Sequence, residues 1–302
     1  MKKIHLSLIG GLGNQLFVYA FACHLIKKYK VHIIFDTSFY SYSKIKIKIN
    51  QLNVNKLDTK NLYGKRFAFL KFFQVLPEKY RHHFIKFFSI NNIKYEKGVD
   101  LERFHRNPPN SNFIFEFNDK EINSIDYLYG YFQNKYYLTN VLKELQKKFE
   151  PKSLTSKKKV LTIFDMIKDK SCALHIRSMN LVNENFMEMV DTNYYSKALD
   201  YFKDKDIKIF YIFTDNIKDA TKTLNKINNF KNYKFINIYQ LSTIEEFYLL
   251  SQFTNIITSI STFSWWAAFL NFQSKSNIIQ PSVWFKHYHL PDSLKIDGSI
   301  IL

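Results

Sequence analysis

Short apolar runs recur along the chain, and each one meets a turn residue and then a helical pattern. The runs cover residues 4–9, 31–35, 172–176, 207–213, 235–239, 255–258 and 277–280. Strands that alternate with helical stretches of about ten to fifteen residues are typical of parallel βα units, and not of a β-sandwich or a helical bundle. The pattern therefore predicts an α/β fold with parallel, doubly wound sheets.

The alternation also suggests how the chain is divided. Pro151 and the polar run at 152–159 form the clearest boundary. With 302 residues, the chain is long enough for two domains of about 150 residues each. We predict an N-terminal α/β domain at 1–150 and a C-terminal α/β domain at 151–302.

Residues 56–110 lack this alternation and are rich in lysine, arginine and phenylalanine. Two interpretations are open. The segment is a helical insertion that buries its phenylalanine face, or it is an amphipathic surface that rests on an anionic membrane leaflet. We favour the insertion and keep peripheral membrane contact as the alternative.

The net charge of +18 comes almost entirely from lysine, in a chain that is also crowded with asparagine, isoleucine, phenylalanine and tyrosine. Such a charge attracts polyanions, an anionic membrane face or a phosphorylated substrate, but a solvated lysine surface explains it as well. Charge alone does not decide between these. We do not expect nucleic acid as a partner and keep it only as a rival hypothesis.

The length of the apolar runs and the number of cysteines indicate the cellular compartment of the protein. No apolar run approaches the roughly 18 to 20 residues that cross a bilayer, and the run from Ile4 to Ile9 breaks at Gly10 before a signal-peptide core forms. Two cysteines, Cys23 and Cys172, do not make a secreted disulfide scaffold. We expect a cytoplasmic protein with reduced thiols, with peripheral contact at the inner membrane face as an option.

The first candidate site is a glycine-rich turn. Three of the seven glycines fall in the run Gly10-Gly11-Leu12-Gly13, which Asn14, Gln15 and a helical pattern follow. Such a turn lets the backbone approach a ligand and aims helix N-terminal N–H groups at an anion. The third glycine of a dinucleotide fingerprint is missing. The turn is a ligand loop or only a tight connection.

Two further sites follow predicted strands. His175-Ile176-Arg177 ends one strand, and Phe213-Thr214-Asp215 ends the next. Open α/β sheets bind ligands beyond the carboxyl ends of their strands, and arginine offers a planar fork for a pyrophosphate. Asp215 suits a ribose or a guanine edge, or it caps the next helix. Arg177 alone also fits an ordinary surface position.

The fourth site follows the strand at 255–258. The run from Ser259 to Ala268 contains Ser261, Thr262, Phe263 and Ser264 and two of the three tryptophans. Hydroxyl and amide groups at a helix start suit phosphate oxygens. The alternative is a capped helix with a buried tryptophan pair.

Metal chemistry has weak support in the sequence. The Asp-x-Asp spelling at 204–206 comes before a strand, at the end of the sheet opposite to the other sites. The nine histidines show no paired-ligand spacing. We expect no metal ligands and metal-independent chemistry, and no Gly-x-Ser-x-Gly elbow indicates a hydrolase.

Taken together, these segments resemble glycosyltransferase family 11, the bacterial α-1,2-fucosyltransferases. The most specific are GGLGNQLFVYA, which starts at Gly10, and STFSWW, which starts at Ser261. The complete set is Gly10 to Ala20, Gly130 to Tyr137, His175 to Arg177, Phe213 to Asp215, Ser261 to Trp266 and Pro281 to Phe285. Order and spacing match over nearly the whole chain.

The resemblance implies a GT-B fold, in which two Rossmann-like domains with parallel sheets face a central cleft. It implies an acceptor-side N-terminal domain and a nucleotide-sugar-binding C-terminal domain. The donor would be GDP-fucose, with no other cofactor, and the acceptor a galactose-containing glycan or lipid-linked oligosaccharide. Transfer to the 2-hydroxyl of galactose would invert the anomeric carbon and serve surface polysaccharide or lipopolysaccharide synthesis.

The resemblance also assigns roles to residues. Arg177 would be catalytic, clamping the pyrophosphate and stabilising its charge as the glycosidic bond breaks. The residues expected at the donor are Gly11, Gly13, Asn14, Gln15, His175, Arg177, Asp215, Ser261, Thr262, Phe263 and Ser264. No general base is selected, since Glu184, Glu188 and Asp191 all follow Arg177.

The sequence departs from the family pattern at the donor motifs. The family continues HxRRGDY and has an aspartate pair and an asparagine before STFS. The residues here are Ser178, Met179, Asn180, Asn216 and Ile260. The alternatives are therefore a transferase for another nucleotide sugar and a catalytically silent nucleotide- or glycan-binding relative.

Overall fold

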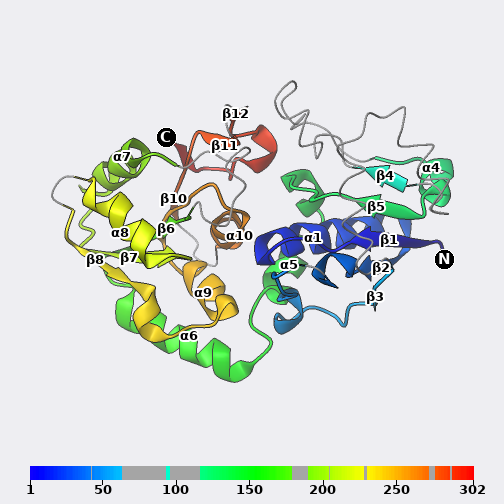
Figure 1. The fold of residues 1–302 in the computed structure, drawn as a ribbon, viewed down its shortest axis with the longest axis horizontal. Coiled ribbons are helices and arrows are strands. Elements are labelled where there is room, and N and C mark those ends of the chain that lie inside the picture. Colours follow the sequence, from blue (N-terminus) through cyan, green and yellow to red (C-terminus); the bar gives the residue numbers. More distant parts are fainter. Residues whose placement is uncertain are drawn as a thin grey trace. The chain divides into compact units, whose positions relative to one another are not determined.

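The computed structural model describes residues 1–41, 43–62, 93–95, 116–178, 190–203, 205–227, 230–271, 276–285 and 288–302. The chain forms two compact α/β units, whose elements are labelled in Figure 1. The first comprises Met1–Asn50, Val54–Phe149 and Asp292–Leu294, and the second comprises Gln51–Asn53, Glu150–Pro291 and Lys295–Leu302. Each unit has its own parallel sheet, so the predicted α/β fold with parallel sheets is confirmed.

The first unit is built on a sheet with strand order β3-β2-β1-β5-β4. All its pairings are parallel. The strands are β1 (Lys3–Ser7), β2 (His32–Asp36), β3 (Thr59–Lys60), β4 (Ile93–Tyr95) and β5 (Tyr127–Tyr129). The helices are α1 (Leu12–Tyr29), α4 (Asp119–Ser124) and α5 (Leu142–Lys148), with 3-10 turns η1 (Ser38–Ser41), η2 (Ile49–Gln51), η5 (Lys135–Leu138) and η8 (Asp292–Leu294).

Helix α1 is the central helix of this unit. Its buried residues lie on every side, from Leu12 through Leu25, so it is covered both by the sheet and by later segments. Phe21 stacks on Phe132 with ring centroids 4.0 Å apart, and it meets Tyr137 edge to face. This packing fixes the start of α1, where the glycine turn lies, relative to residues 130–137.

The second unit is built on a sheet with strand order β13-β10-β9-β6-β7-β8. Its pairings are also parallel. The strands are β6 (Ser171–Ile176), β7 (Ile209–Thr214), β8 (Tyr233–Phe235), β9 (Asn255–Ile257), β10 (Asn277–Gln280) and β13 (Ile300–Ile301). A small antiparallel pair, β11 (Val283–Phe285) and β12 (Tyr288–His289), precedes β13.

Helices cover both faces of the second sheet. They are α6 (Leu154–Ile167), α7 (Thr192–Lys203), α8 (Ile217–Asn225), α9 (Thr243–Leu250) and α10 (Thr262–Leu270), with the 3-10 turn η7 at Ile236–Tyr239. Cys172, Leu174 and Ile176 of β6 pack with α7 and α8. The alternate residue His175 faces Phe263 of α10. This alternation is the period of two of a strand buried on both faces.

Two expectations about elements need correction. Residues 235–239 were expected to form a strand, but β8 ends at Phe235 and the rest is the 3-10 turn η7. Within 56–110, only 56–62 and 93–95 are described, and both contribute a short strand to the first sheet. The basic-aromatic helices expected there lie outside the described residues.

The described residues contain no helix that combines the length and the apolar character needed to cross a membrane.

Candidate active site

The glycine turn lies between β1 and α1 in the first unit. Gly10 has a φ of +75°, and a Cβ there would lie 2.5 Å from Nδ2 of Asn14. Only glycine meets both requirements without strain. Gly11 is the N-cap of α1 and has no side chain that could cap the helix, and Gly13 is buried within its first turn. The backbone N–H groups of this turn therefore carry the partial positive charge of the helix start.

Gln15 is fully buried, and its side chain bonds the backbone of the glycine turn. Its Nε2 donates to the carbonyls of Gly10 and Lys46, both at 3.0 Å. Its Oε1 accepts from the N–H groups of Lys48 and Ile49 at 2.9 and 3.0 Å. These four bonds use the hydrogen-bonding capacity of the amide. Gln15, which was predicted to contact the donor, is thus placed to hold the turn in position.

Asn14 is the polar side chain that the turn leaves half-exposed. Its Oδ1 accepts a hydrogen bond of 3.1 Å from Nε2 of Gln133. Gln133 follows Phe132, which has a φ of +51° and stacks on α1. Two separate sequence motifs thus meet at Asn14, and sequence reasoning had given Gln133 no role.

Asp36 ends β2, near where a dinucleotide-binding fold places its ribose ligand. It is fully buried. Its carboxylate accepts from the hydroxyl of Tyr127 at 2.7 Å and from the N–H groups of Ser38 and Leu62. Asp36 therefore connects the end of β2 to β5, on the far side of β1, and to the segment after β3.

Arg177 and Asp215 come together at the carboxyl ends of β6 and β7 in the second unit. Nη1 of Arg177 lies 2.8 Å from Oδ2 of Asp215, and their side chains are 35% and 20% exposed. Oδ1 of Asp215 accepts the N–H of Ser178 at 2.8 Å. The Ser178 hydroxyl donates in turn to Asp219 of α8. The ion pair thus orients the guanidinium, and no other described residue bonds its remaining N–H groups.

His175 lies beneath this pair and is 4% exposed. Its Nδ1 is 3.1 Å from the Ser259 hydroxyl, and its carbonyl accepts from the Tyr195 hydroxyl at 3.3 Å. Burial lowers the pKa of His175 to about 3, and the positive charge of Arg177 adds to this effect. The imidazole is neutral at physiological pH, so it positions neighbouring groups and adds no charge.

The segment after β9 forms the N-terminus of α10. Ser261 caps the helix by accepting the N–H of Phe263 at 3.3 Å. Ser264 is fully buried, and its hydroxyl lies between the N–H of Ser259 and the carbonyl of Ser261, both at 3.3 Å. Among the described residues, the half-buried Thr262 hydroxyl has no partner, so it is the group that a ligand can reach most directly.

The predicted site residues therefore fall into two groups. Gly11, Gly13, Asn14 and Gln15 gather in the first unit, and the remaining candidates gather around the carboxyl ends of three neighbouring strands in the second. Sequence reasoning did not assign roles to four supporting residues, Ser178, Tyr195, Asp219 and Ser259. Ser178 and Ser259 adjoin predicted motifs, whereas Tyr195 and Asp219 carried no signal. Within the described residues, no three His, Cys, Asp or Glu side chains are grouped to hold a metal ion.

Comparison with known proteins identifies the family to which the chain belongs. The model of Glycosyl transferase family 11 matches residues 3–292. The chain belongs to glycosyltransferase family 11. Among its curated family relatives is the Escherichia coli O-antigen biosynthesis glycosyltransferase WbnK, 27% identical over 92% of this chain and 93% of the relative. Another is the Escherichia coli α-1,2-colitosyltransferase, 24% identical over 96% and 95%.

A solved structure of an Arabidopsis thaliana FUT1 mutant with GDP aligns with 92% of the family 11 chain and 70% of its own length. The TM-score is 0.47 at 11% identity.

The structure shows what replaces the family residues at three of the altered positions. Ser178 stands in place of the second arginine and bonds Asp215 and Asp219. Asn216 caps α8 by accepting the N–H of Asp219 at 3.3 Å. Ile260 is 3% exposed and packs into the core. The other two altered residues, Met179 and Asn180, lie outside the described residues.

Proposed function

We propose that this family 11 glycosyltransferase moves L-fucose from GDP-fucose to the 2-hydroxyl of a galactose-containing glycan. The reaction is inverting, metal-independent and α-1,2-specific, and it serves surface polysaccharide synthesis at the cytoplasmic side. The observation that carries the proposal is the Arg177–Asp215 pair at 2.8 Å, at the strand edge where parallel sheets bind ligands.

Arg177 has the properties that a departing diphosphate requires. As the bond between the sugar and the phosphate breaks, negative charge develops on the phosphate oxygens. A guanidinium fixed in advance stabilises that charge more in the transition state than in the bound donor. Asp215 fixes the guanidinium by the ion pair, and the N–H of Ser178 in turn fixes Asp215. His175, neutral and buried, keeps β6 and the Ser259 loop in place.

The start of α10 complements Arg177. Its first N–H groups and the Thr262 hydroxyl present donors to phosphate oxygens, and Ser261 and Ser264 hold the loop. Phe263 packs on His175 at 5.8 Å between ring centroids, which joins the two motifs. Contact of Asp215 with the nucleoside and of Asn14 with the donor are further parts of the proposal.

The relatives support parts of this assignment to different degrees. The name of the α-1,2-colitosyltransferase states the same linkage with another sugar, and WbnK is named for O-antigen synthesis. They support a glycan acceptor and make colitose a second candidate for the transferred sugar. The residues Ser178 and Asn216 at the donor motifs are a reason to test both sugars.

The decisive experiment is turnover of GDP-fucose with galactose-terminated acceptors. We expect wild-type transfer, and a fall of kcat by about 10²- to 10³-fold in Arg177→Ala, the range for losing one preorganised donor. Lys208→Ala is the matched control, because Lys208 is an exposed cation just before β7, at the opposite edge of the sheet. An unaffected Arg177→Ala enzyme would remove the proposed mechanism.

Donor identity needs its own measurement. Calorimetry with GDP, UDP and dTDP should show a preference for GDP, and a preference for UDP would exclude GDP-fucose. Turnover with nucleotide-linked colitose in place of GDP-fucose would reassign the sugar. Binding without turnover of either sugar across a broad set of galactosides would indicate a silent relative.

Membrane contact is proposed only as peripheral. Sedimentation with anionic liposomes at low salt tests it, because electrostatic attachment weakens as salt rises. Protein that stays in the supernatant at low salt would exclude the contact.

A further inference from the structure

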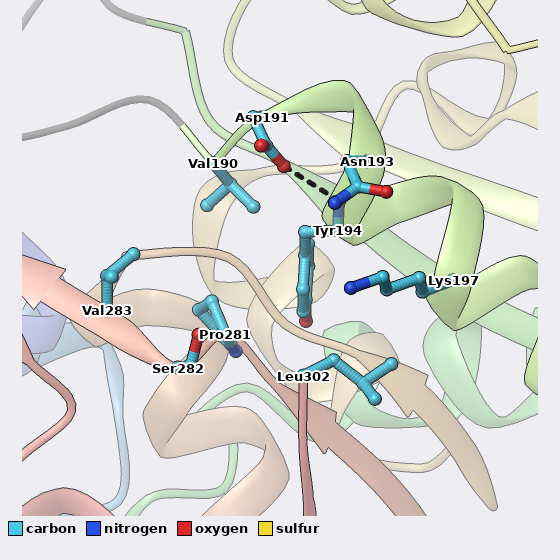
Figure 2. Close-up of a pocket in the computed structure, with 9 residues that line it drawn as sticks. All are labelled: Val190, Asp191, Asn193, Tyr194, Lys197, Pro281, Ser282, Val283 and Leu302. Atoms are coloured by element: carbon cyan, nitrogen blue, oxygen red, sulfur yellow. Dashed lines mark hydrogen bonds between the residues drawn. The ribbon is translucent and has the colours of Figure 1, made fainter.

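A hollow lies at the carboxyl edge of the second sheet, the edge that also carries Arg177. It is a cavity of about 210 Å³ between the first turns of α7 and the segment that follows β10. Figure 2 shows its described lining, with Tyr194 in the middle and Pro281 and Ser282 facing it. The volume is below the roughly 300–1,000 Å³ of pockets for drug-sized ligands. Its volume therefore suits one small ring.

The floor of the cavity is apolar and rigid. Tyr194 is 5% exposed, and Pro281 is buried beside it. The Tyr194 hydroxyl lies 2.8 Å from the carbonyl of Thr258 and 3.2 Å from the carbonyl of Ile279. The ring is thus tied to the ends of β9 and β10, and it presents a fixed wall to anything that enters.

The rim carries solvent-exposed polar side chains that a ligand can reach, among them Asp191, Asn193 and Lys197. One oxygen of Asp191 accepts the Tyr194 N–H at 2.8 Å, and the other has no partner there. The backbone N–H and carbonyl of Ser282 are bonded to Leu302 and Leu290, whereas its hydroxyl has no partner among the described residues. The Asn193 amide and the Lys197 ammonium likewise have no partner among these residues, and Figure 2 shows the Lys197 amino group directed toward the cavity.

The charges of this rim select the kind of ligand. Asp191 and Lys197 are the charged side chains of the described lining, and their charges are opposite. A phosphate would meet the Asp191 carboxylate, so an anion gains little here. A neutral ring with several hydroxyl groups can donate to Asp191 and accept from Lys197 and Asn193, while its carbon face rests on the apolar floor.

The cavity is connected to the Arg177 site through shared elements. Tyr195 follows Tyr194 on α7, and its hydroxyl reaches the carbonyl of His175 at 3.3 Å. Thr258, which holds Tyr194, precedes Ser259, which bonds His175. β10 is separated from β6 only by β9, which places the two strands about 10 Å apart. The cavity and Arg177 therefore lie at the same edge of the second sheet, beyond the ends of strands that only β9 separates.

We propose that this cavity binds a neutral pyranose ring of the saccharide substrate, held by Asp191, Asn193 and Lys197 over Tyr194. This assignment rests on the proposed function. The ring belongs to the acceptor glycan or is the sugar carried by the donor, and the two sources are separable by measurement.

The experiment compares wild type with Asn193→Ala and Lys197→Ala. The control is Lys203→Ala, at the end of the same helix, where Lys203 pairs with Asp200. We expect each test variant to raise the KM for the acceptor about tenfold, the equivalent of one hydrogen bond. The affinity for GDP, measured by calorimetry, should not change. A loss of affinity for GDP-fucose with unchanged affinity for GDP assigns the ring to the donor instead.

Two outcomes would overturn the proposal. The first is a loss of GDP affinity equal to the loss of saccharide affinity, and the second is unchanged saccharide and donor kinetics in both test variants. Saturation-transfer NMR with free galactosides separates this result from the proposed function. Galactoside binding to wild type that the variants lose supports the pocket even if no fucose is transferred, whereas wild type without such binding or any transfer contradicts both.

Discussion

The burial of His175 predicts that the folded protein loses stability in acid. Unfolded histidine titrates near a pKa of about 6.5, whereas burial lowers the folded pKa of His175 to about 3. Between these values the unfolded chain binds the proton and the folded chain does not, so falling pH favours unfolding. Above pH 6.5 both states are neutral and His175 contributes no pH dependence. The variant His175→Asn removes this titration and keeps an amide that can bond Ser259.

The magnitude follows from the width of that window. Each pH unit below the unfolded pKa costs about 1.4 kcal/mol of stability for one excluded proton. At pH 5, wild type should therefore have lost about 2 kcal/mol more than His175→Asn, relative to pH 7.5. The comparison between the two proteins cancels the carboxylates, which titrate in both.

Two measurements check this reasoning. Urea unfolding at pH 7.5 and 5 gives the change in free energy for wild type and variant. NMR of the histidine ring carbons should show one signal that stays constant from pH 8 to 5 and is absent from the variant. A His175 signal with a midpoint near 6.5 would refute the argument, and so would equal acid sensitivity of the two proteins.

Three substitutions in the first unit test how the glycine turn and its surroundings are held. Gly10→Ala should cost about 1 to 2 kcal/mol from its left-handed backbone, and more from the contact with Asn14, so an unchanged melting temperature would contradict the turn geometry. Gln15→Ala strands buried carbonyl and N–H groups and should cost about 3 kcal/mol or more in urea unfolding. Tyr127→Phe keeps the ring but removes the hydroxyl donated to Asp36, which should cost about 1.5 to 3 kcal/mol in the same assay.

The pattern of apolar runs was sufficient to predict the long strands and the parallel arrangement of the sheets. The run at 277–280 coincides with β10, and the run at 172–176 differs from β6 by one residue. Short elements were missed because two or three residues carry too little periodicity, as in β3 and β4. Residues 236–239 have strand composition, yet they form the 3-10 turn η7.

Motifs located the candidate site, but not which side chains face a ligand. Gln15 and Ser264 belong to conspicuous motifs and are nevertheless buried, with their polar atoms bonded to backbone. Three of the four backbone groups that bond the Gln15 side chain lie more than 30 residues away along the chain. Such contacts depend on where the fold places a loop that is distant in the sequence, and the local sequence around Gln15 does not encode that position.

The exchange of short segments between the two units has a consequence for engineering. Leu52, fully buried, forms a bridge with Pro151 and belongs to the second unit, although it lies within the N-terminal half of the sequence. Asp292–Leu294 returns to the first unit near the C-terminus. A chimera of two family members that is cut once near residue 150 would therefore pair Leu52 of one parent with the core of the other. Transplanting the second unit intact requires moving residues 51–53, 150–291 and 295–302 together.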